Sequence, residues 1–236
     1  SGGKRFRALL ALIASDIFKI NQDSAIYAAI CCEFIHNASL IHDDLQDRDL
    51  LRRGLPTIWN RFGDHTAINL GDYFIAGSLE ALSKIKGNPE NKCKAIEHLS
   101  YTIQQTVKGQ SLEILERSNL NLRMQEYEST AKAKTGGLIC WPIKLIMILN
   151  GQKNIDEIDF KPLYEAGLAY QIQDDLSDFL GIKDRGLPGR DLKEGKMNVL
   201  IMHFLETATN GERFLLKEFF AKKSESISED DILNWI

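Results

Sequence analysis

Apolar residues recur at intervals of three and four along almost the whole chain, as in the series Ile96, Leu99, Ile103, Val107 and Ile114. This is the period of an amphipathic α-helix, and no stretch sustains the two-residue alternation of a half-buried strand. Only two valines are present, which also disfavours β-structure. The sequence therefore predicts an all-α fold.

Two segments, residues 25–40 and 137–149, are apolar on nearly every face, and we expect them to be central helices of a bundle. Glycine, proline and asparagine break the helical pattern at residues 54–56, 87–89, 150–151 and 181–189. Since the composition does not shift across these breaks, we predict a single domain over residues 1–236. The chain opens at Ser1 inside a Gly-Gly-Lys-Arg motif, so we expect it to be trimmed at both ends.

The composition is that of an ordinary globular protein, with 44% hydrophobic residues, 26% charged residues and a formal net charge of -4. This balance indicates neither a nucleic-acid nor a membrane partner. The longest apolar run, residues 138–149, is too short to span a bilayer, and no secretory segment is visible. The four cysteines, Cys31, Cys32, Cys93 and Cys140, lack Cys-x-x-Cys spacing. We therefore expect reduced cysteines in a cytoplasmic protein without a transmembrane segment.

Two aspartate-rich stretches, residues 43–47 and 174–178, carry carboxylates at positions i, i+1 and i+4. On an α-helix, positions i and i+4 share one face and i+1 lies beside them. Two such faces opposed across a bundle would concentrate negative charge and require cations. Hard oxygen ligands favour Mg2+, which shares its shell with substrate phosphates, so we expect several Mg2+ ions and a diphosphate. The expected metal ligands are Asp43, Asp44, Asp47, Asp174, Asp175 and Asp178.

Further motifs accompany the acidic stretches in a fixed order. They are residues 2–7 (Gly-Gly-Lys-Arg-Phe-Arg), 34–44, 52–54 (Arg-Arg-Gly), 71–73, 109–110, 134–136 (Lys-Thr-Gly), 171–175, 189–191 (Gly-Arg-Asp) and 195–196 (Gly-Lys). From Gly2 to about Leu205 the chain resembles the trans-isoprenyl diphosphate synthases, the polyprenyl synthetase family. This resemblance implies a helical bundle of the isoprenoid synthase type with a central apolar cavity, usually assembled as a homodimer.

The resemblance also implies the reaction. Members of this family join an allylic prenyl diphosphate to isopentenyl diphosphate, head to tail, giving a longer all-trans prenyl diphosphate and diphosphate. Ionising the allylic C–O bond requires the leaving diphosphate to be neutralised as its charge grows, which Mg2+ does as a Lewis acid. No covalent intermediate or protein base is required, because in this family the released diphosphate accepts the proton.

Roles for individual residues follow from the same resemblance. A diphosphate bound without metal needs direct cationic contacts, and the residues that cradle isopentenyl diphosphate are expected to be Lys4, Arg7, His36 and Arg53. The allylic diphosphate is expected to contact Arg52, Lys134 and Lys196, while Gln171 and Thr135 face the developing carbocation. Together with the aspartates of both motifs these form the expected catalytic set.

Structural interpretations of these residues compete with the functional ones. Acidic triplets more often cap helices, basic clusters such as residues 2–7 are usually surface tails, and helix lysines such as Lys134 are commonly exposed. Two equally spaced triplets beside apolar sequence favour the metal site. We favour function for His36, structure for His42, and a shared cavity for Gln171 and Asp175, which lie one helical turn apart.

The chain departs from the family pattern at two places. The lysine that usually precedes the Gly-x-Asp loop motif is absent, and a cation from Lys183, Arg185 or Arg190 is expected to replace it. The usual Thr-Leu-Pro after the final Gly-Lys is replaced by residues 198–200, Asn-Val-Leu. Which of these cations substitutes, and why the second change is tolerated, stays open.

Product length in such bundles depends on how far an apolar tunnel extends below the first acidic motif. Ala38 and Ser39, about one turn earlier on that helix, are small. We therefore expect a geranylgeranyl or longer product, with Phe34 or Phe74 as a deeper stop.

Three other functions compete with this interpretation. A class I terpene cyclase shares the fold and the first motif, but its second metal site normally mixes Asn, Ser or Thr with Glu. A non-catalytic subunit of a heteromeric prenyl synthase would be expected to have lost one acidic motif. A generic acidic metal buffer leaves Arg52 and Arg53 unexplained. The allylic primer, the final chain length, the identity of the partner subunit and the downstream pathway are not determined by the sequence.

Overall fold

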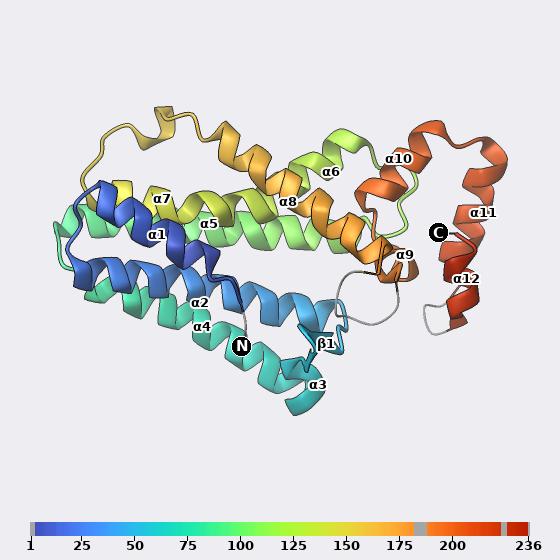
Figure 1. Cartoon of the computed structure of the whole chain (residues 1–236), viewed down its shortest axis with the longest axis horizontal. Helices are drawn as coiled ribbons and strands as arrows, with labels where there is room; N and C mark the ends of the chain where they lie inside the picture. Colours follow the sequence, from blue (N-terminus) through green and yellow to red (C-terminus); the bar gives the residue numbers. More distant parts are fainter. Residues whose placement is uncertain (1–2, 182–187, 223–225, 236) are drawn as a thin grey trace.

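The computed structural model describes residues 3–181, 188–222 and 226–235, and these are built almost entirely from helices (Figure 1). The α-helices are α1 (Phe6–Ile17), α2 (Gln22–Gln46), α3 (Ile58–Phe62), α4 (Asp64–Lys84), α5 (Pro89–Leu115), α6 (Met124–Ala131), α7 (Gly137–Leu149), α8 (Lys161–Phe179), α9 (Arg190–Lys193), α10 (Val199–Thr207), α11 (Asn210–Ala221) and α12 (Glu229–Leu233). A π-helix (Lys132–Gly136) joins α6 to α7, and a 3-10 helix (Ile155–Glu157) precedes α8. The all-α prediction is confirmed.

The two segments predicted as central helices correspond to α2 and α7. Helix α2 begins after Asn21, whose side-chain oxygen accepts a hydrogen bond from the Ser24 amide at 3.0 Å and so caps the helix. Helix α7 is buried along most of its length, including Trp141 and Leu145. The predicted breaks at residues 54–56, 87–89 and 150–151 also separate helices in the structure.

A small hairpin follows α2 and was not predicted. Its strands β1 (Leu51–Arg52) and β2 (Leu55–Pro56) pair antiparallel. The turn between them is formed by Arg53 and Gly54, both with positive φ, of 54° and 72°. Two successive positive φ angles are typical of the tight turn that matches the twist of a hairpin. The hairpin thereby fixes Arg52 and Arg53 directly beyond the first acidic motif.

Buried apolar side chains form two clusters. The larger cluster joins α1, α2, α4, α5 and α7, and includes Leu82, Leu99 and Trp141. The second joins α6, α8, α10, α11 and α12, and includes Met202 and Leu216. Helices α10 to α12 lie at one end of the bundle, and the C-terminal ends of α2 and α8 both lie near α9 (Figure 1). Both acidic motifs are therefore carried to the same region; the single-domain expectation stays a prediction.

Helix α2 is long and apolar enough, by length and composition alone, to cross a membrane, which the sequence analysis did not notice. Half of its most apolar window is buried within the described residues. The core helix of a soluble protein passes the same test, so this is weak evidence for a membrane span. The four cysteines are free, with Cys31, Cys32 and Cys140 buried and Cys93 exposed; their reduced state stays a prediction.

Candidate active site

A cavity of about 190 Å³ lies among α2, α5, the π-helix, α8 and the segment after α9. Most of the predicted site residues line it: Arg7, His36, Asp43, Asp47, Arg52, Lys134, Thr135, Gln171, Asp174, Asp175 and Lys196. Four predicted residues, Lys4, Arg53, Asp44 and Asp178, do not belong to its lining. Apolar side chains, among them Leu40, Leu112 and Leu138, line the cavity beside the charged ones, and the apolar tunnel expected below the first motif stays a prediction.

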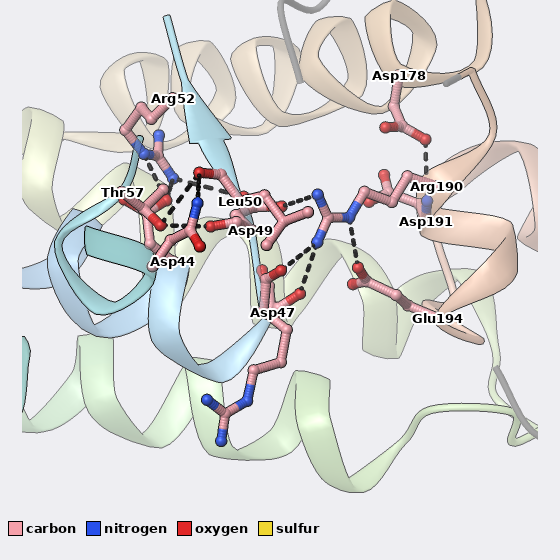
Figure 2. A network of polar contacts seen from close by, with 12 residues as sticks. Asp44, Asp47, Asp49, Leu50, Arg52, Thr57, Asp178, Arg190, Asp191 and Glu194 are labelled. Atoms are coloured by element: carbon pink, nitrogen blue, oxygen red, sulfur yellow. Dashed lines mark hydrogen bonds and ion pairs between the residues drawn. The ribbon is translucent and has the colours of Figure 1, made fainter. Parts of the chain in front are cut away.

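The first acidic motif divides into two kinds of carboxylate. Asp43 and Asp47, one helical turn apart, line the cavity. Asp44 is 5% exposed and turns to the hairpin, where Arg52 Nε donates a hydrogen bond to its Oδ1 at 2.6 Å (Figure 2). Asp44 therefore holds Arg52 at the cavity wall.

Asp47 forms ion pairs with two cations. Its Oδ1 accepts a hydrogen bond from Arg117 Nη2 at 2.6 Å, and its Oδ2 accepts one from Lys196 Nζ at 2.7 Å. Burial acts to raise the pKa of Asp47, but the charges of Lys196, Lys134 and Arg117 outweigh it and hold this pKa below its usual value. Asp47 is therefore ionised and neutralised by side chains from two distant segments.

The second acidic motif divides differently. Asp174 lines the cavity. Asp175 is 3% exposed and accepts hydrogen bonds from the Tyr127 hydroxyl at 2.7 Å, the Val199 amide at 3.0 Å and Gln171 Nε2 at 2.9 Å. Burial raises the pKa of Asp175 to about 6 in spite of these donors. These bonds tie Asp175 to α6, α8 and the start of α10.

Asp178, one turn further along α8, accepts hydrogen bonds from the start of α9. Its Oδ2 accepts a hydrogen bond from the Asp191 amide at 3.0 Å, and its carbonyl oxygen accepts one from the Gly189 amide at 3.1 Å (Figure 2). The expectation that Asp44 and Asp178 hold metal stays a prediction, because each is occupied in packing a neighbouring segment.

The π-helix sets the positions of Lys134 and Thr135. A π turn adds a residue to the helical register and is frequent at functional sites. Here it brings Lys134 Nζ to 3.1 Å from Glu113 Oε2, and Thr135 Oγ1 donates to Gln171 Oε1 at 3.2 Å. Burial alone would lower the pKa of Lys134, but Asp43 and Glu113 raise it, so the ammonium stays charged. The predicted neighbourhood of Thr135 and Gln171 is thus present.

The cationic side of the cavity surrounds His36. Burial lowers the pKa of His36 to about 3, and Arg7, Arg53 and Arg52 add to this shift. His36 is therefore neutral and close to three guanidinium groups. The Nε of Arg7 and the Nδ1 of His36 are buried donors or acceptors without a hydrogen-bond partner. Such unpaired buried groups are costly unless a ligand or water satisfies them, which favours an anion-binding role.

Lys4 is exposed and lies outside the cavity lining, whereas Arg53 packs against the start of the chain. A Cβ on Gly3 would lie 2.5 Å from Arg53 Nη1, the flexible end of that side chain, so a larger residue here would require Arg53 to move. His42, expected to be structural, has its ring against Gly71, where a Cβ would lie 2.1 Å from Nε2. His42 is not part of the cavity lining.

The two departures from the family pattern have different outcomes. Arg190 does not line the cavity but contacts Asp49 and Glu194 (Figure 2), whereas Lys183 and Arg185 lie outside the described residues. The residues after the final Gly-Lys have a clear structural role: Asn198 caps α10 by accepting from the Ile201 amide at 3.1 Å. The Val199 amide is the one that bonds Asp175.

The donor set around the cavity suits a hard divalent cation, because Asp43, Asp47 and Asp174 offer carboxylate oxygens to one space. Among the residues that the structure describes, no three acidic, histidine or cysteine side chains lie close enough together to hold a metal ion. The chemistry of the lining therefore fits magnesium, whereas a ready-made coordination shell is not seen in the described part of the chain.

Three site residues escaped the sequence analysis. Glu113 pairs with Lys134, Arg117 pairs with Asp47, and Tyr127 donates to Asp175. Glu113 lies one turn beyond Gln110, and this spacing could have indicated it. Arg117 lies in the connection between α5 and α6, where periodicity carries no signal, and Tyr127 lies on the short helix α6.

One cavity of the helical bundle is lined by residues of two aspartate motifs, by buried cations and by a hydrogen-bonded threonine and glutamine. These features together define the class of diphosphate-handling prenyltransferases. The profile of the family described as Polyprenyl synthetase matches residues 1–233. The chain belongs to the polyprenyl synthetase family and is a trans-prenyltransferase.

Individual relatives agree with this assignment. The chain is 35% identical to a geranylgeranyl diphosphate synthase of Saccharolobus solfataricus, over 98% of this chain and 70% of that protein. It is 33% identical to heptaprenyl diphosphate synthase component 2 of Bacillus subtilis, over 98% of this chain and 66% of that protein. The crystal structure of a geranylgeranyl pyrophosphate synthetase from Pyrococcus horikoshii aligns with a TM-score of 0.79 and 29% identity, over 99% of this chain and 71% of that chain.

Proposed function

We propose that this prenyltransferase condenses an allylic prenyl diphosphate with isopentenyl diphosphate and releases a longer all-trans prenyl diphosphate. The observation that carries the proposal is that both acidic motifs and the cations Arg7, Arg52, Lys134 and Lys196 line one cavity. A reaction between two diphosphates needs both kinds of group, because one diphosphate is held through metal and the other by direct cationic contacts.

The acidic wall is assigned to Mg2+. Asp43, Asp47 and Asp174 line the cavity and would hold the ions, with Asp175 behind them. Bound magnesium supplies Lewis-acid stabilisation of the leaving diphosphate. Lys134 and Lys196 add positive charge to the cavity lining. Arg52 also lines the cavity and is held in place by Asp44.

The remaining polar groups are assigned to the second substrate and to the cation. Arg7 and His36, with buried unpaired nitrogens, would bind the diphosphate of isopentenyl diphosphate, supported by Lys4 and Arg53. The oxygens of Thr135 and Gln171 would stabilise positive charge on the allylic carbon, because an oxygen lone pair directed at a developing charge lowers the barrier.

The product is proposed to be geranylgeranyl diphosphate or a longer prenyl diphosphate. Ser39 lines the cavity and is small, and no aromatic residue occupies residues 38–40. The relatives of similar identity include both a geranylgeranyl and a heptaprenyl diphosphate synthase. Overall identity therefore does not select between these lengths, and the residues below the acidic motif must do so.

A homodimer in the cytoplasm is the proposed working state. Large apolar side chains are exposed on α4 and α5, among them Tyr73, Val107 and Leu115. Apolar surface of this kind favours a subunit interface. The name of the Bacillus relative denotes one component of an enzyme, so a different partner chain is the competing arrangement. Sedimentation of the purified protein, alone and at several concentrations, distinguishes a self-associating chain from one that stays monomeric.

The test of the proposed function is product analysis with isopentenyl diphosphate, Mg2+ and each of dimethylallyl, geranyl and farnesyl diphosphates. We expect a longer prenyl diphosphate with at least one primer, and no reaction when isopentenyl diphosphate is omitted. Hydrocarbon released from farnesyl diphosphate alone would show a cyclase instead. Binding of diphosphate with Mg2+ but no turnover by the isolated chain would indicate a non-catalytic subunit.

A further inference from the structure

Within the described residues, Arg190 contacts two backbone carbonyls and two carboxylates, and its own side chain does not line the cavity (Figure 2). Its Nη2 donates to the carbonyl oxygens of Asp47 at 3.1 Å and Arg48 at 2.6 Å, and its Nη1 lies 3.0 Å from Asp49 Oδ1. Its Nε donates to Glu194 Oε1 at 2.7 Å. The side chain is 20% exposed, so these contacts are only partly screened by water.

The carbonyls that Arg190 binds are at the C-terminal end of α2. The last carbonyls of a helix have no partner within the helix, and a cation there satisfies them and opposes the negative end of the helix dipole. One of these accepting carbonyls belongs to Asp47, whose carboxylate also lines the cavity. Fixing its backbone therefore fixes the base from which its side chain extends.

The segment that carries Arg190 is also held in place by hydrogen bonds. Arg190 is the first residue of α9, and the Asp191 amide next to it bonds Asp178 Oδ2 of the second acidic motif. The Gly189 amide on the other side bonds the Asp178 carbonyl. Arg190 thus connects a segment fixed to α8 with the end of α2.

The loop that carries Asp49 is held independently of Arg190. The Thr57 hydroxyl donates to the Asp49 carbonyl at 2.6 Å, and Trp59 Nε1 donates to the same oxygen at 2.8 Å. Asp49 is 3% exposed. Arg190 therefore binds a preformed set of acceptors, which the five N–H donors of a planar guanidinium can reach at several points, whereas an ammonium has only three donors at one atom.

We propose that Arg190 is a positioning residue that sets the separation of the two acidic motifs, by holding α9 and Asp178 against the C-terminal end of α2. It takes no part in binding substrate. The inference deepens the proposed function, because the separation of the motifs matters only if ions are shared between them. Partners that orient metal ligands typically change metal affinity by about 10- to 100-fold when removed.

The first measurement is hydrogen exchange on the metal-free, substrate-free protein, comparing the wild type with Arg190→Gln. We expect faster exchange in two places together, residues 47–50 and residues 189–196, with the middle of α2 and α7 unchanged. This readout does not depend on turnover, so it separates failure of this inference from failure of the proposed function. Unchanged exchange, faster exchange on one side only, or an equal increase throughout the bundle would overturn the proposal.

The second measurement is the Mg2+ dependence of the rate. In Arg190→Gln we expect the Mg2+ concentration for half-maximal rate to rise about 10-fold or more, with KM for isopentenyl diphosphate unchanged. Arg190→Lys should recover part of the loss. If Arg190 had a purely structural role, its replacement would lower the active fraction without changing the Mg2+ dependence. A raised KM for isopentenyl diphosphate would show that Arg190 contacts substrate. Either result counts against a positioning role.

Two further variants complete the test. Arg48→Gln is the matched control, because the Arg48 side chain pairs with exposed Asp64 at 2.8 Å while its carbonyl still accepts from Arg190. It should behave as the wild type in both measurements. Asp49→Asn removes the negative charge of one partner and leaves the carbonyls, so it should give a smaller shift of the same kind. If Arg190→Gln fails to fold, Asp49→Asn decides the question by the same criteria.

Discussion

The Nζ atom of Lys196 lies 2.7 Å from Oδ2 of Asp47, although the two residues are 149 positions apart in the chain. Arg117 occupies the other carboxylate oxygen at 2.6 Å. Asp47 is therefore held by two cations from different segments, one after α9 and one at the end of α5. Each cation can be removed while the other still pairs with the buried carboxylate.

Lys196→Met should lower kcat by about 100- to 1,000-fold, the usual effect of removing one preorganised electrostatic contact. Stability should fall as well, because Lys196 also lies 3.5 Å from the largely buried carboxylates of Asp191 and Glu194, and Arg117 compensates only Asp47. Steady-state kinetics and denaturant unfolding measure the two effects separately. Lys193→Met, on α9, is the control and should keep wild-type kcat. A similar fall in both variants would mean that the general charge of this segment, rather than the position of Lys196, supports catalysis.

Asp43 and Asp44 are adjacent in the chain but should respond differently to mutation. Asp43→Asn should abolish most turnover without loss of stability, because Asp43 lines the cavity. Asp44→Asn should lower the free energy of unfolding by about 3 kcal/mol, since among the described residues it leaves the largely buried Arg52 with only the longer contact to Asp49 at 3.9 Å. Activity at saturating Mg2+, measured below the unfolding transition, should be lower for Asp43→Asn than for Asp44→Asn. The reverse order would mean that Asp44, not Asp43, is the metal ligand.

The two acidic motifs show which features of the fold and the site could be predicted from the sequence and which could not. Helical periodicity was sufficient for the fold class and for α2 and α7, because burial of an apolar face dominates helix packing. The spacing of the aspartates was identical in both motifs, yet Asp43 and Asp47 line the cavity in one, and Asp174 and Asp175 in the other. Helix phase relative to the cavity depends on packing against distant elements, so spacing alone could not determine it.

Residues far apart in the sequence account for the rest of what was missed. Arg117 pairs with Asp47 across 70 positions, and Tyr127 reaches Asp175 across 48. Neither has a local pattern that distinguishes it from a surface side chain. The hairpin of residues 51–56 was missed for a different reason, since its strands are only two residues long and show no alternation.

The neutral state of His36 should make the protein sensitive to acid. Because its pKa is lowered to about 3 in the fold, against 6.5 in the unfolded chain, only the unfolded state binds a proton between these values. Stability should therefore fall as pH drops below 6.5, and the contribution of His36 at pH 5 should be about 2 kcal/mol. Urea unfolding of the substrate-free protein at pH 7.5 and pH 5 measures it.

The variant His36→Gln should lose correspondingly less stability between these two pH values. The matched control is His203→Gln, because His203 is exposed on α10, with 74% of its side chain accessible. This control should retain the acid sensitivity of the wild type. Equal losses in wild type and His36→Gln would show that His36 is not held neutral by its surroundings.

Two glycines beside the π-helix should respond in opposite directions to the same substitution. A Cβ at Gly167 of α8 would lie 2.5 Å from the Gly136 Cα, so Gly167→Ala must push α8 away from the π-helix. We expect a loss of about 3 kcal/mol. At Gly137 a Cβ would meet nothing within 4 Å, and Gly137→Ala should stabilise the helix by about 0.5–1 kcal/mol. Chemical denaturation measures both; a destabilising Gly137→Ala would show that this helix needs local flexibility.

Product length should depend on the residues one turn before Asp43. Ser39 lines the cavity, whereas Ala38 is 2% exposed and packed inside the bundle. Ser39→Phe should therefore shorten the product, because the ring would block the space below the acidic motif. Ala38→Phe should shorten it only if the growing chain passes between α2 and its neighbours at that depth.

The same experiment tests the proposed deeper stop. Phe34 and Phe74 form an edge-to-face pair with centroids 5.1 Å apart, so they close the gap between α2 and α4 together. Phe74→Ala should lengthen the product if the chain reaches this pair, and the double variant Ser39→Phe with Phe74→Ala should still give the short product. Chromatography of the dephosphorylated products gives the answer directly. A long product from the double variant would mean that the growing prenyl chain passes on the other side of α2, and it would exclude the proposed tunnel.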